Sequence, residues 1–316
     1  MRAVLIVSLA LWVAGVGMAQ SAEASDGPLN GRISFGKISP AVGDFVIWSA
    51  RADGSDQKRL THVPSFFSDW SPNGRRIAFD FVDQTGVHVA TMTAGGRQTR
   101  QLTFGVGVQE VPKWSPDGRW ITFDASPTLP DDPAGFSTAI WIVRADGSHA
   151  RRVSHGGFDV EPVFSPDGSQ IAFARLGTVT PSGLQLAAVY VVNVDGTHLH
   201  RVIAARAGLE HLDWSPDSRW ISFNIAPEAG GQVGGAVMAR HPDGTDGRVL
   251  HRPTARFVFF KAVWSPDGDK LLVGCHDLKI GIDKLCRIRP GSARVTVVIN
   301  TTRIPVNFPA WGARIR

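Results

Sequence analysis

The sequence has 316 residues, of which 43% are hydrophobic and 19% charged, a composition typical of a folded globular protein and not of a disordered chain. The 33 Lys and Arg against 28 Asp and Glu give a formal net charge of +5, and the excess is spread along the chain without a basic block. Nucleic-acid binding is therefore not expected, because a nucleic-acid site usually gathers its basic residues in one patch.

The first 24 residues are predicted to be a secretory signal peptide. Arg2 supplies the positive start, and the apolar stretch from Ala3 to Gly17 is shorter than the ~20 residues that a membrane-spanning helix needs. Cleavage is expected at one of the small residues Ala19, Ala22 and Ala24. The alternative is an anchor that is not cleaved. No later apolar stretch approaches membrane-spanning length, so we expect a soluble mature chain, residues 25–316, in the periplasm or secreted.

From about residue 30 the chain consists of repeated units. Each unit has an aromatic residue followed by Ser-Pro and a turn residue pair, as in Trp114-Ser115-Pro116-Asp117-Gly118. The aromatic residues at this position are called the anchor aromatics here. Five of them follow one another at steps of 44, 50, 50 and 50 residues: Trp70, Trp114, Phe164, Trp214 and Trp264. A period of this size indicates repeated supersecondary units.

Each unit is predicted to contain four strands. Proline suits the second position of a type I turn, and Ser and Gly suit its ends. The Ile-x-Phe that follows, as in Ile121-Thr122-Phe123, alternates as a strand does. A second hairpin signal, Asp-Gly, comes later in the unit at Asp53, Asp146, Asp195 and Asp243.

The repeat is split between the two ends of the chain. Residues 30–35 match the sequence that follows the turn of the next unit, so the first unit lacks its anchor aromatic. A sixth anchor, Trp311, stands 47 residues after Trp264 near the C-terminus. We therefore predict one all-β domain over residues 25–316, a six-bladed β-propeller of four-stranded antiparallel blades. Its C-terminal strand pairs with the N-terminal blade and closes the ring.

The repeat resembles the WD40-like (PD40) repeat of the TolB family over about residues 30–316. The resemblance rests on Trp-Ser-Pro-Asp-Gly-x-x-Ile-x-Phe and on the fourth-strand signature seen at Arg59-Leu60-Thr61 and Gln101-Leu102-Thr103. It implies a propeller fold and, because TolB partners the peptidoglycan-associated lipoprotein in envelope integrity, an exported protein that binds a partner. Similar repeats also precede the catalytic domain of prolyl-oligopeptidase-type peptidases.

The predicted topology puts the Ser-Pro-Asp-Gly and Asp-Gly turns on one face, called the turn face. The variable loops and the links between units share the opposite face, called the loop face, where binding is expected. The links carry the only chemically suggestive set of side chains, which comprises Glu110, His155, Asp159, Glu161, Glu210, His211 and Lys261.

Two interpretations of this set remain open. The side chains could meet around the channel and bind a partner or a divalent cation such as calcium, or they could be solvated link residues, the interpretation that we favour. The sequence contains no zinc-protease, P-loop or dinucleotide motif. No other cofactor is expected.

The only two cysteines, Cys275 and Cys286, are predicted on the second and third strands of one unit. In an exported protein they could form a disulfide across that hairpin, and the alternative is two buried thiols.

The function that these patterns favour is a monomeric, non-enzymatic binding module for a protein or an envelope polymer. The alternative is a stand-alone propeller enzyme of the lyase or lactonase type with a divalent metal in the central channel.

Overall fold

The computed structural model describes residues 30–127, 137–181, 183, 185–225, 235–301 and 304–313. The predicted signal peptide, residues 1–24, lies outside this part of the chain, as do most residues of the variable loops around 126–136 and 227–233. Within the described ranges, no helix combines the length and the apolar character needed to cross a membrane.

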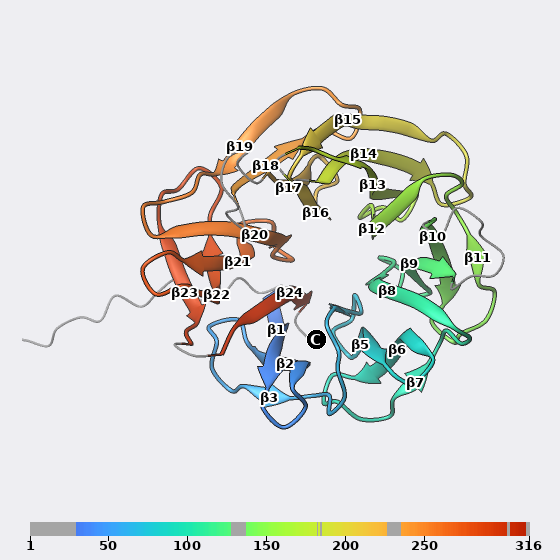
Figure 1. Cartoon of the computed structure of the whole chain (residues 1–316), viewed down its shortest axis with the longest axis horizontal. Coiled ribbons are helices and arrows are strands. Elements are labelled where there is room, and N and C mark those ends of the chain that lie inside the picture. Colours follow the sequence, from blue (N-terminus) through green and yellow to red (C-terminus); the bar gives the residue numbers. More distant parts are fainter. Residues whose placement is uncertain are drawn as a thin grey trace, which may run out of the picture.

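The described residues form four antiparallel sheets of four strands and one sheet of eight strands, arranged around a central axis (Figure 1). The first sheet has the order β24 (Val306–Ala313), β1 (Asn30–Ser39), β2 (Asp44–Arg51), β3 (Lys58–Arg59). Three further four-stranded sheets follow the chain order: β12 (Phe158–Phe164), β13 (Gln170–Val179), β14 (Gln185–Asn193), β15 (His200–Ala207); β16 (Leu209–Trp214), β17 (Ile221–Ile225), β18 (Ala236–Arg240), β19 (Gly247–His251); and β20 (Phe257–Trp264), β21 (Leu271–Asp277), β22 (Ile282–Ile288), β23 (Val295–Ile299).

The remaining strands belong to one eight-stranded sheet. It contains the runs β4 (Ser68–Trp70), β5 (Arg76–Val82), β6 (Gly86–Thr93), β7 (Arg100–Gln101) and β8 (Gly107–Trp114), β9 (Trp120–Pro127), β10 (Ala139–Arg144), β11 (Arg151–Arg152). The two runs are joined only where β6 pairs in parallel with β8, Gly86 with Gly107 and Val87 with Val108.

The C-terminal strand closes the ring, as the split repeat predicted. β24 pairs antiparallel with β1, and the anchor Trp311 stands opposite Ile33. Figure 1 shows the red β24 beside the blue β1. Within its sheet, β24 is the strand nearest the central axis of the ring. The first and last segments of the described chain are thereby held in one sheet, which leaves no open edge between them.

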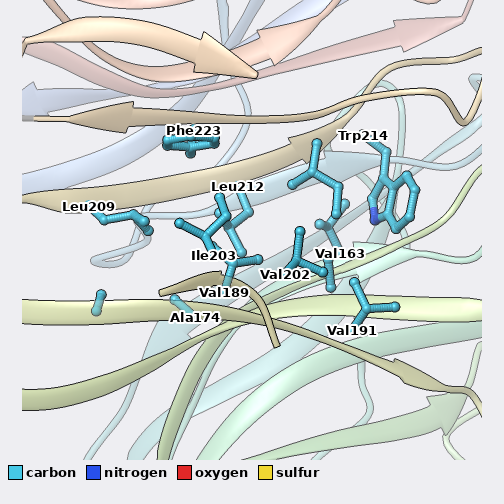
Figure 2. Close-up of a cluster of buried hydrophobic side chains, with 13 residues drawn as sticks. Val163, Ala174, Val189, Val191, Val202, Ile203, Leu209, Leu212, Trp214 and Phe223 are labelled. Atoms are coloured by element: carbon cyan, nitrogen blue, oxygen red, sulfur yellow. The ribbon is translucent and has the colours of Figure 1, made fainter. Parts of the chain in front are cut away.

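The hydrophobic core lies between the faces of neighbouring sheets. One cluster joins Val189 and Val202 of the β12–β15 sheet to Leu212, Trp214 and Phe223 of the next (Figure 2). These side chains are all less than 7% exposed. The alternating apolar residues therefore serve the packing between sheets, which is why each unit needs its neighbours.

The Ser-Pro-Asp-Gly stretch folds as the predicted turn. In the copy around Trp114, the Gly118 N–H donates to the Ser115 carbonyl at 2.9 Å, and the Ser115 hydroxyl donates to Asp117 Oδ1 at 2.6 Å. The same hydroxyl oxygen accepts from the Trp120 N–H at 2.8 Å. Gly118 has a φ of 69°, a conformation that glycine adopts without steric cost. The motif thus satisfies its own polar groups and acts as a structural corner.

Candidate functional site

Five of the six inner strands carry a β-bulge three residues before the anchor aromatic. Register shifts interrupt the pairing there, and five non-glycine residues have positive φ values between 50° and 56°. These five are Val111, Glu161, His211, Lys261 and Phe308. Phe67 occupies the matching position before Trp70. Such backbone conformations cost free energy in non-glycine residues and are common where a side chain has to be re-aimed.

The side chains of the five bulge residues and of Phe67 surround a small cavity of about 50 Å³ in the channel. Because the chain runs along each inner strand from the link to the turn, the bulge lies toward the loop face. We call these six residues and the carboxyl side chains near them the channel mouth. The carboxyl side chains are Asp80, Glu110, Asp124 and Glu210.

The Glu161–His211 pair forms the polar centre of the channel mouth. His211 Nδ1 lies 2.6 Å from Glu161 Oε1, and the His211 backbone N–H donates to Glu161 Oε2 at 2.8 Å. Glu210 Oε2 lies 3.5 Å from His211 Nε2. Burial would raise the pKa of Glu161, but His211 and Lys261 outweigh it and lower that pKa to about 2. Glu161 therefore remains a carboxylate at neutral pH.

Lys261 faces the same centre across an aromatic cluster. Its Nζ lies 3.6 Å from the ring centroid of Phe308 and 4.6 Å from that of Phe67. Burial lowers the pKa of Lys261 to about 8, although Glu161, Glu210, Asp80 and Glu110 oppose the shift. Among the described residues Lys261 makes no hydrogen bond or ion pair, so its ammonium depends on ring faces and on nearby carboxylates at longer range.

Polar side chains of the second strands hold the bulges in place. Asp124 Oδ2 accepts from the Glu161 N–H of the next unit at 2.8 Å, and Asn224 Oδ1 accepts from Ala262 N–H at 3.2 Å. Asp80 Oδ1 accepts from the N–H groups of Phe66 and Phe67 at 2.8 and 3.0 Å. A bulge leaves backbone donors unpaired, and a buried donor needs an acceptor.

One unit solves the same problem differently. Its second strand has Ala174 at the position of Asp80, Asp124 and Asn224, and alanine offers no acceptor; two further units have Gly36 and Gly274 there. Glu161 supplies the acceptor for the His211 N–H instead, from the inner strand. Glu161 thus lines the channel mouth and also connects two neighbouring sheets by a hydrogen bond.

The channel mouth gathers more carboxyl groups than the sequence suggested. Burial raises the pKa of Asp80 to about 7, and the charge of Glu110 adds to the shift. Burial also raises the pKa of Glu110, with the charge of Glu161 as a further cause. The pKa of Asp124 is raised well above its usual value, by burial and then by Glu110. Of these four carboxyl groups, only Glu161 has a lowered pKa, and burial favours the neutral form of the other three.

The structure brings together five of the seven residues expected around the channel. Glu161, His211 and Lys261 line the mouth cavity, Glu110 interacts electrostatically with Glu161 and Lys261, and Glu210 stands at the rim, 47% exposed.

Asp159 and His155 do not join them. Asp159 is fully buried and paired with Arg175, with Nε to Oδ1 at 2.6 Å and Nη2 to Oδ2 at 2.9 Å, and the guanidinium lies over the Tyr190 ring. This pair holds the sheet together away from the mouth. His155 is exposed in the link after β11.

Sequence reasoning missed Phe67, Val111, Phe308 and the carboxylates Asp80 and Asp124. The signal for the first three was the position three residues before each anchor aromatic. For the last two it was the residue directly after Ile-x-Phe on the second strand. Both are repeat positions, and each becomes meaningful only once the bulge is known.

The described residues contain no group of three or more His, Cys, Asp or Glu side chains placed to hold a metal ion. The carboxylates of the mouth are instead turned to backbone N–H groups and to His211.

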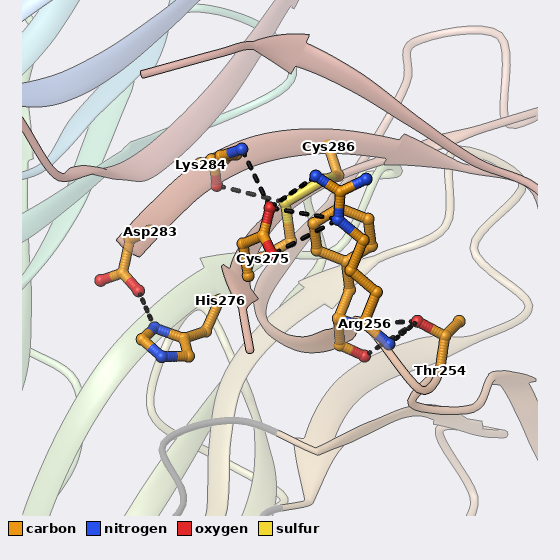
Figure 3. The surroundings of a disulfide bond; sticks show 9 residues. Thr254, Arg256, Cys275, His276, Asp283, Lys284 and Cys286 are labelled. Carbon is orange, nitrogen blue, oxygen red and sulfur yellow. Dashed lines mark hydrogen bonds and ion pairs between the residues drawn. A yellow bond between two sulfur atoms is a disulfide. The ribbon is translucent and has the colours of Figure 1, made fainter. Parts of the chain in front are cut away.

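A disulfide joins Cys275 on β21 to Cys286 on β22 (Figure 3). Beside it, Asp277 accepts from Lys284 Nζ at 3.0 Å and from Arg256 Nη2 at 2.9 Å, and neither Asp277 nor Lys284 is more than 4% exposed. The two cations, Arg256 first, lower the pKa of Asp277 to about 2 in spite of its burial. A covalent bond and a buried ion pair thus stiffen the same hairpin.

The closed ring of four-stranded sheets with its Ser-Pro-Asp-Gly corners defines a TolB-like β-propeller. TolB from Acinetobacter baumannii has the same fold, with a TM-score of 0.71 at 18% identity, covering 89% of this chain and 66% of that chain. The chain is 33% identical over 147 residues to a TolB homolog of Chlorobium luteolum, which marks it as a distant homologue of TolB.

That match covers 44% of this chain and 31% of the Chlorobium protein. An uncharacterised protein of Agrobacterium fabrum is 26% identical over 197 residues, covering 60% of this chain and 62% of that protein. The chain thus spans less than two thirds of the length of either relative. No family model matches the chain.

Proposed function

We propose that this chain is an exported, non-enzymatic β-propeller that binds a protein or an envelope polymer through its loop face. The observation that carries the proposal is the distribution of exposed apolar side chains. Seven large hydrophobic side chains are exposed in the described part of the chain, and six of them lie on links or loops of the loop face. These six are Val63, Phe104, Val106, Val179, Leu278 and Ile280.

The turn face has only Leu199 of this set among the described residues. Phe104 is 73% exposed and Val106 67%, on the link between β7 and β8. Exposed apolar side chains near polar ones are typical of surfaces that contact another macromolecule, and rigid scaffolds present them on loops. The unequal distribution therefore favours docking on the loop face.

The channel mouth would add polar specificity to this surface. Lys261 and the Glu161–His211 pair stand at its centre, beside the half-buried rings of Phe67 and Phe308. A partner segment with charged and apolar groups could contact both kinds of side chain, which is how interfaces usually combine an apolar centre with polar specificity.

We infer that the ring has six blades. The chain has six anchor aromatics, and the eight-stranded sheet contains two complete four-strand runs, one with Trp70 and one with Trp114 on its inner strand. Two residue pairs are all that joins these runs, so they support two adjacent blades.

Export is supported by two features. The N-terminal residues have the pattern of a signal peptide, and the disulfide belongs to the oxidising compartments outside the cytoplasm.

Site-specific photo-crosslinking in cells tests the proposal. Benzoylphenylalanine is placed at Phe104 or Ile280 on the loop face, and at Leu199 on the turn face as the matched control. We expect crosslinked products from the first two positions and none from the third. Equal crosslinking from Leu199, or none from any position, would contradict the proposed docking face.

The alternative, a stand-alone propeller enzyme with a divalent metal in the channel, has a separate test. Elemental analysis of the purified protein would have to find stoichiometric metal, and the double substitution Glu161→Gln and Glu210→Gln would have to remove it. Metal-free protein that still crosslinks would favour the binding module.

A further inference from the structure

At the opposite end of the channel, on the turn face, we propose a second binding site, which takes an organic cation. The group recognised is a primary ammonium or a guanidinium on an apolar stem. Lys113 and Val263 line both this site and the cavity of the channel mouth, but Asp69, Asp213 and the anchor aromatics line only this one. The site therefore goes beyond the proposed function and does not depend on it.

The site is a cavity of about 280 Å³ lined by the six anchor aromatics and by the five prolines of the Ser-Pro turns. A water molecule occupies about 30 Å³ of liquid, so the cavity has room for a small organic group. Pro72, Pro116 and Pro216 are exposed as well as lining it, so the cavity reaches the surface on the turn face.

Three ionisable side chains line the cavity: Asp69, Lys113 and Asp213. Asp69 Oδ2 accepts from the Trp114 N–H at 2.8 Å, and Asp213 Oδ2 accepts from the Trp264 N–H at 2.7 Å. Lys113 Nζ lies 3.6 Å from Asp69 Oδ1. Two fixed carboxylates thus share one resident ammonium, and Asp213 has no ion-pair partner of its own among the described residues.

The aromatic lining suits a cation. The Nε1 atoms of the anchor tryptophans are buried and make no hydrogen bond within the described structure, so the rings offer carbon surface to the cavity rather than N–H donors. Ring faces attract ammonium and guanidinium groups, most strongly where water is excluded. An anion would meet two carboxylates and only one ammonium.

The pKa shifts of the two carboxyl groups also favour a cation at this site. Burial raises the pKa of Asp213 to about 6 and also raises that of Asp69, although Lys113 opposes both shifts. An added cation would stabilise both carboxylates. A metal ion fits less well, because the described residues here offer two carboxylates and no third ligand of the His, Cys, Asp or Glu type.

Isothermal titration calorimetry at pH 8 and low salt tests the site, with 1,5-diaminopentane as the probe and 1,5-pentanediol as its neutral counterpart. We expect the diamine to bind at least tenfold more tightly than the diol. Asp213→Asn should weaken diamine binding at least tenfold, because it removes the carboxylate but keeps an acceptor for the Trp264 N–H. Asp269→Asn, an exposed carboxylate on the same face but outside the cavity, is the matched control and should leave binding unchanged.

A substitution with the opposite expected sign separates charge recognition from damage to the fold. Lys113→Met removes the resident ammonium, so the diamine should bind severalfold more tightly than to the unmodified chain. Arg314 and Arg316 follow the lining residue Ala313 in the sequence, so a chain ending at Ala313 is titrated as well. Equal or tighter binding by this chain supports the site, and loss of binding contradicts it.

Three results would overturn the proposal. The first is a diamine affinity no greater than that of the diol. The second is unchanged affinity in Asp213→Asn while its thermal unfolding stays cooperative. The third is displacement of the diamine by millimolar calcium chloride at constant ionic strength, which would make the site a metal site. None of these measurements depends on the loop face, so failure here leaves the crosslinking result intact.

Discussion

Asp80 offers a test of how burial controls charge in the channel. Its side chain is fully buried on β5, Oδ1 accepts two backbone N–H groups, and Oδ2 makes no hydrogen bond within the described structure. Burial, and then the charge of Glu110, raise its pKa to about 7 from 3.8. The folded protein therefore keeps a proton on Asp80 that the unfolded chain releases near pH 4.

The sign of the pH dependence follows. Between about pH 4 and pH 7 the folded state binds more protons at this position, so the free energy of unfolding falls as the pH rises. Each unit of pKa difference corresponds to about 1.4 kcal/mol, so the loss between pH 4.5 and pH 8 is about 3 kcal/mol. Asp80→Asn keeps an oxygen for the Phe66 and Phe67 N–H groups and removes the titration.

Urea unfolding at pH 4.5 and pH 8 measures the effect. The stability of Asp80→Asn relative to the unmodified chain should rise by about 3 kcal/mol between the two pH values, whatever constant cost the new amide group adds. Asp269→Asn, an exposed carboxylate with no such environment, should show no comparable change. A difference for Asp80→Asn that is the same at both pH values would refute the reasoning.

Three further predictions concern stability. Replacing Cys275 and Cys286 by Ala should lower the free energy of unfolding by about 2–3 kcal/mol in urea, and reductant should affect only the unmodified chain. Asp277→Asn should cost roughly 3 kcal/mol because it leaves Lys284 buried without its carboxylate, and the variant should lack the loss of stability that the unmodified chain shows as the pH falls from about 4 toward 2. Trp311→Ala should cost about 3–5 kcal/mol by urea unfolding, whereas a cost below 1 kcal/mol would contradict a closing role for β24.

Much of the candidate site was within reach of sequence reasoning. The links were expected to carry it, but the structure places Glu161, His211 and Lys261 within the inner strands β12, β16 and β20, where they line the channel mouth. Asp159 was grouped with them because it is close in sequence, yet its neighbour in space is Arg175 on the adjacent strand. Sequence position shows which unit a residue belongs to, but not which way its side chain points.

The mouth also contains residues that composition does not mark as functional. Phe67, Val111 and Phe308 read as core residues, yet all three line the channel, and a bulge re-aims Val111 and Phe308 toward it. The pKa shifts of Asp80 and Asp124 could not be predicted either, because they arise from burial and from carboxylates of other units.

The sequence by itself determined the repeat, the turns and the closure of the ring. Those features follow from local rules: Pro and Gly dihedrals, apolar alternation, and an anchor aromatic missing at one end and present at the other. The tertiary structure alone decided which charges meet, since residues about 50 positions apart become neighbours only around the axis. It also gave the anchor aromatics a second role. They pack the sheets, as the repeat predicted, and together with Asp69 and Asp213 they line the cavity on the turn face.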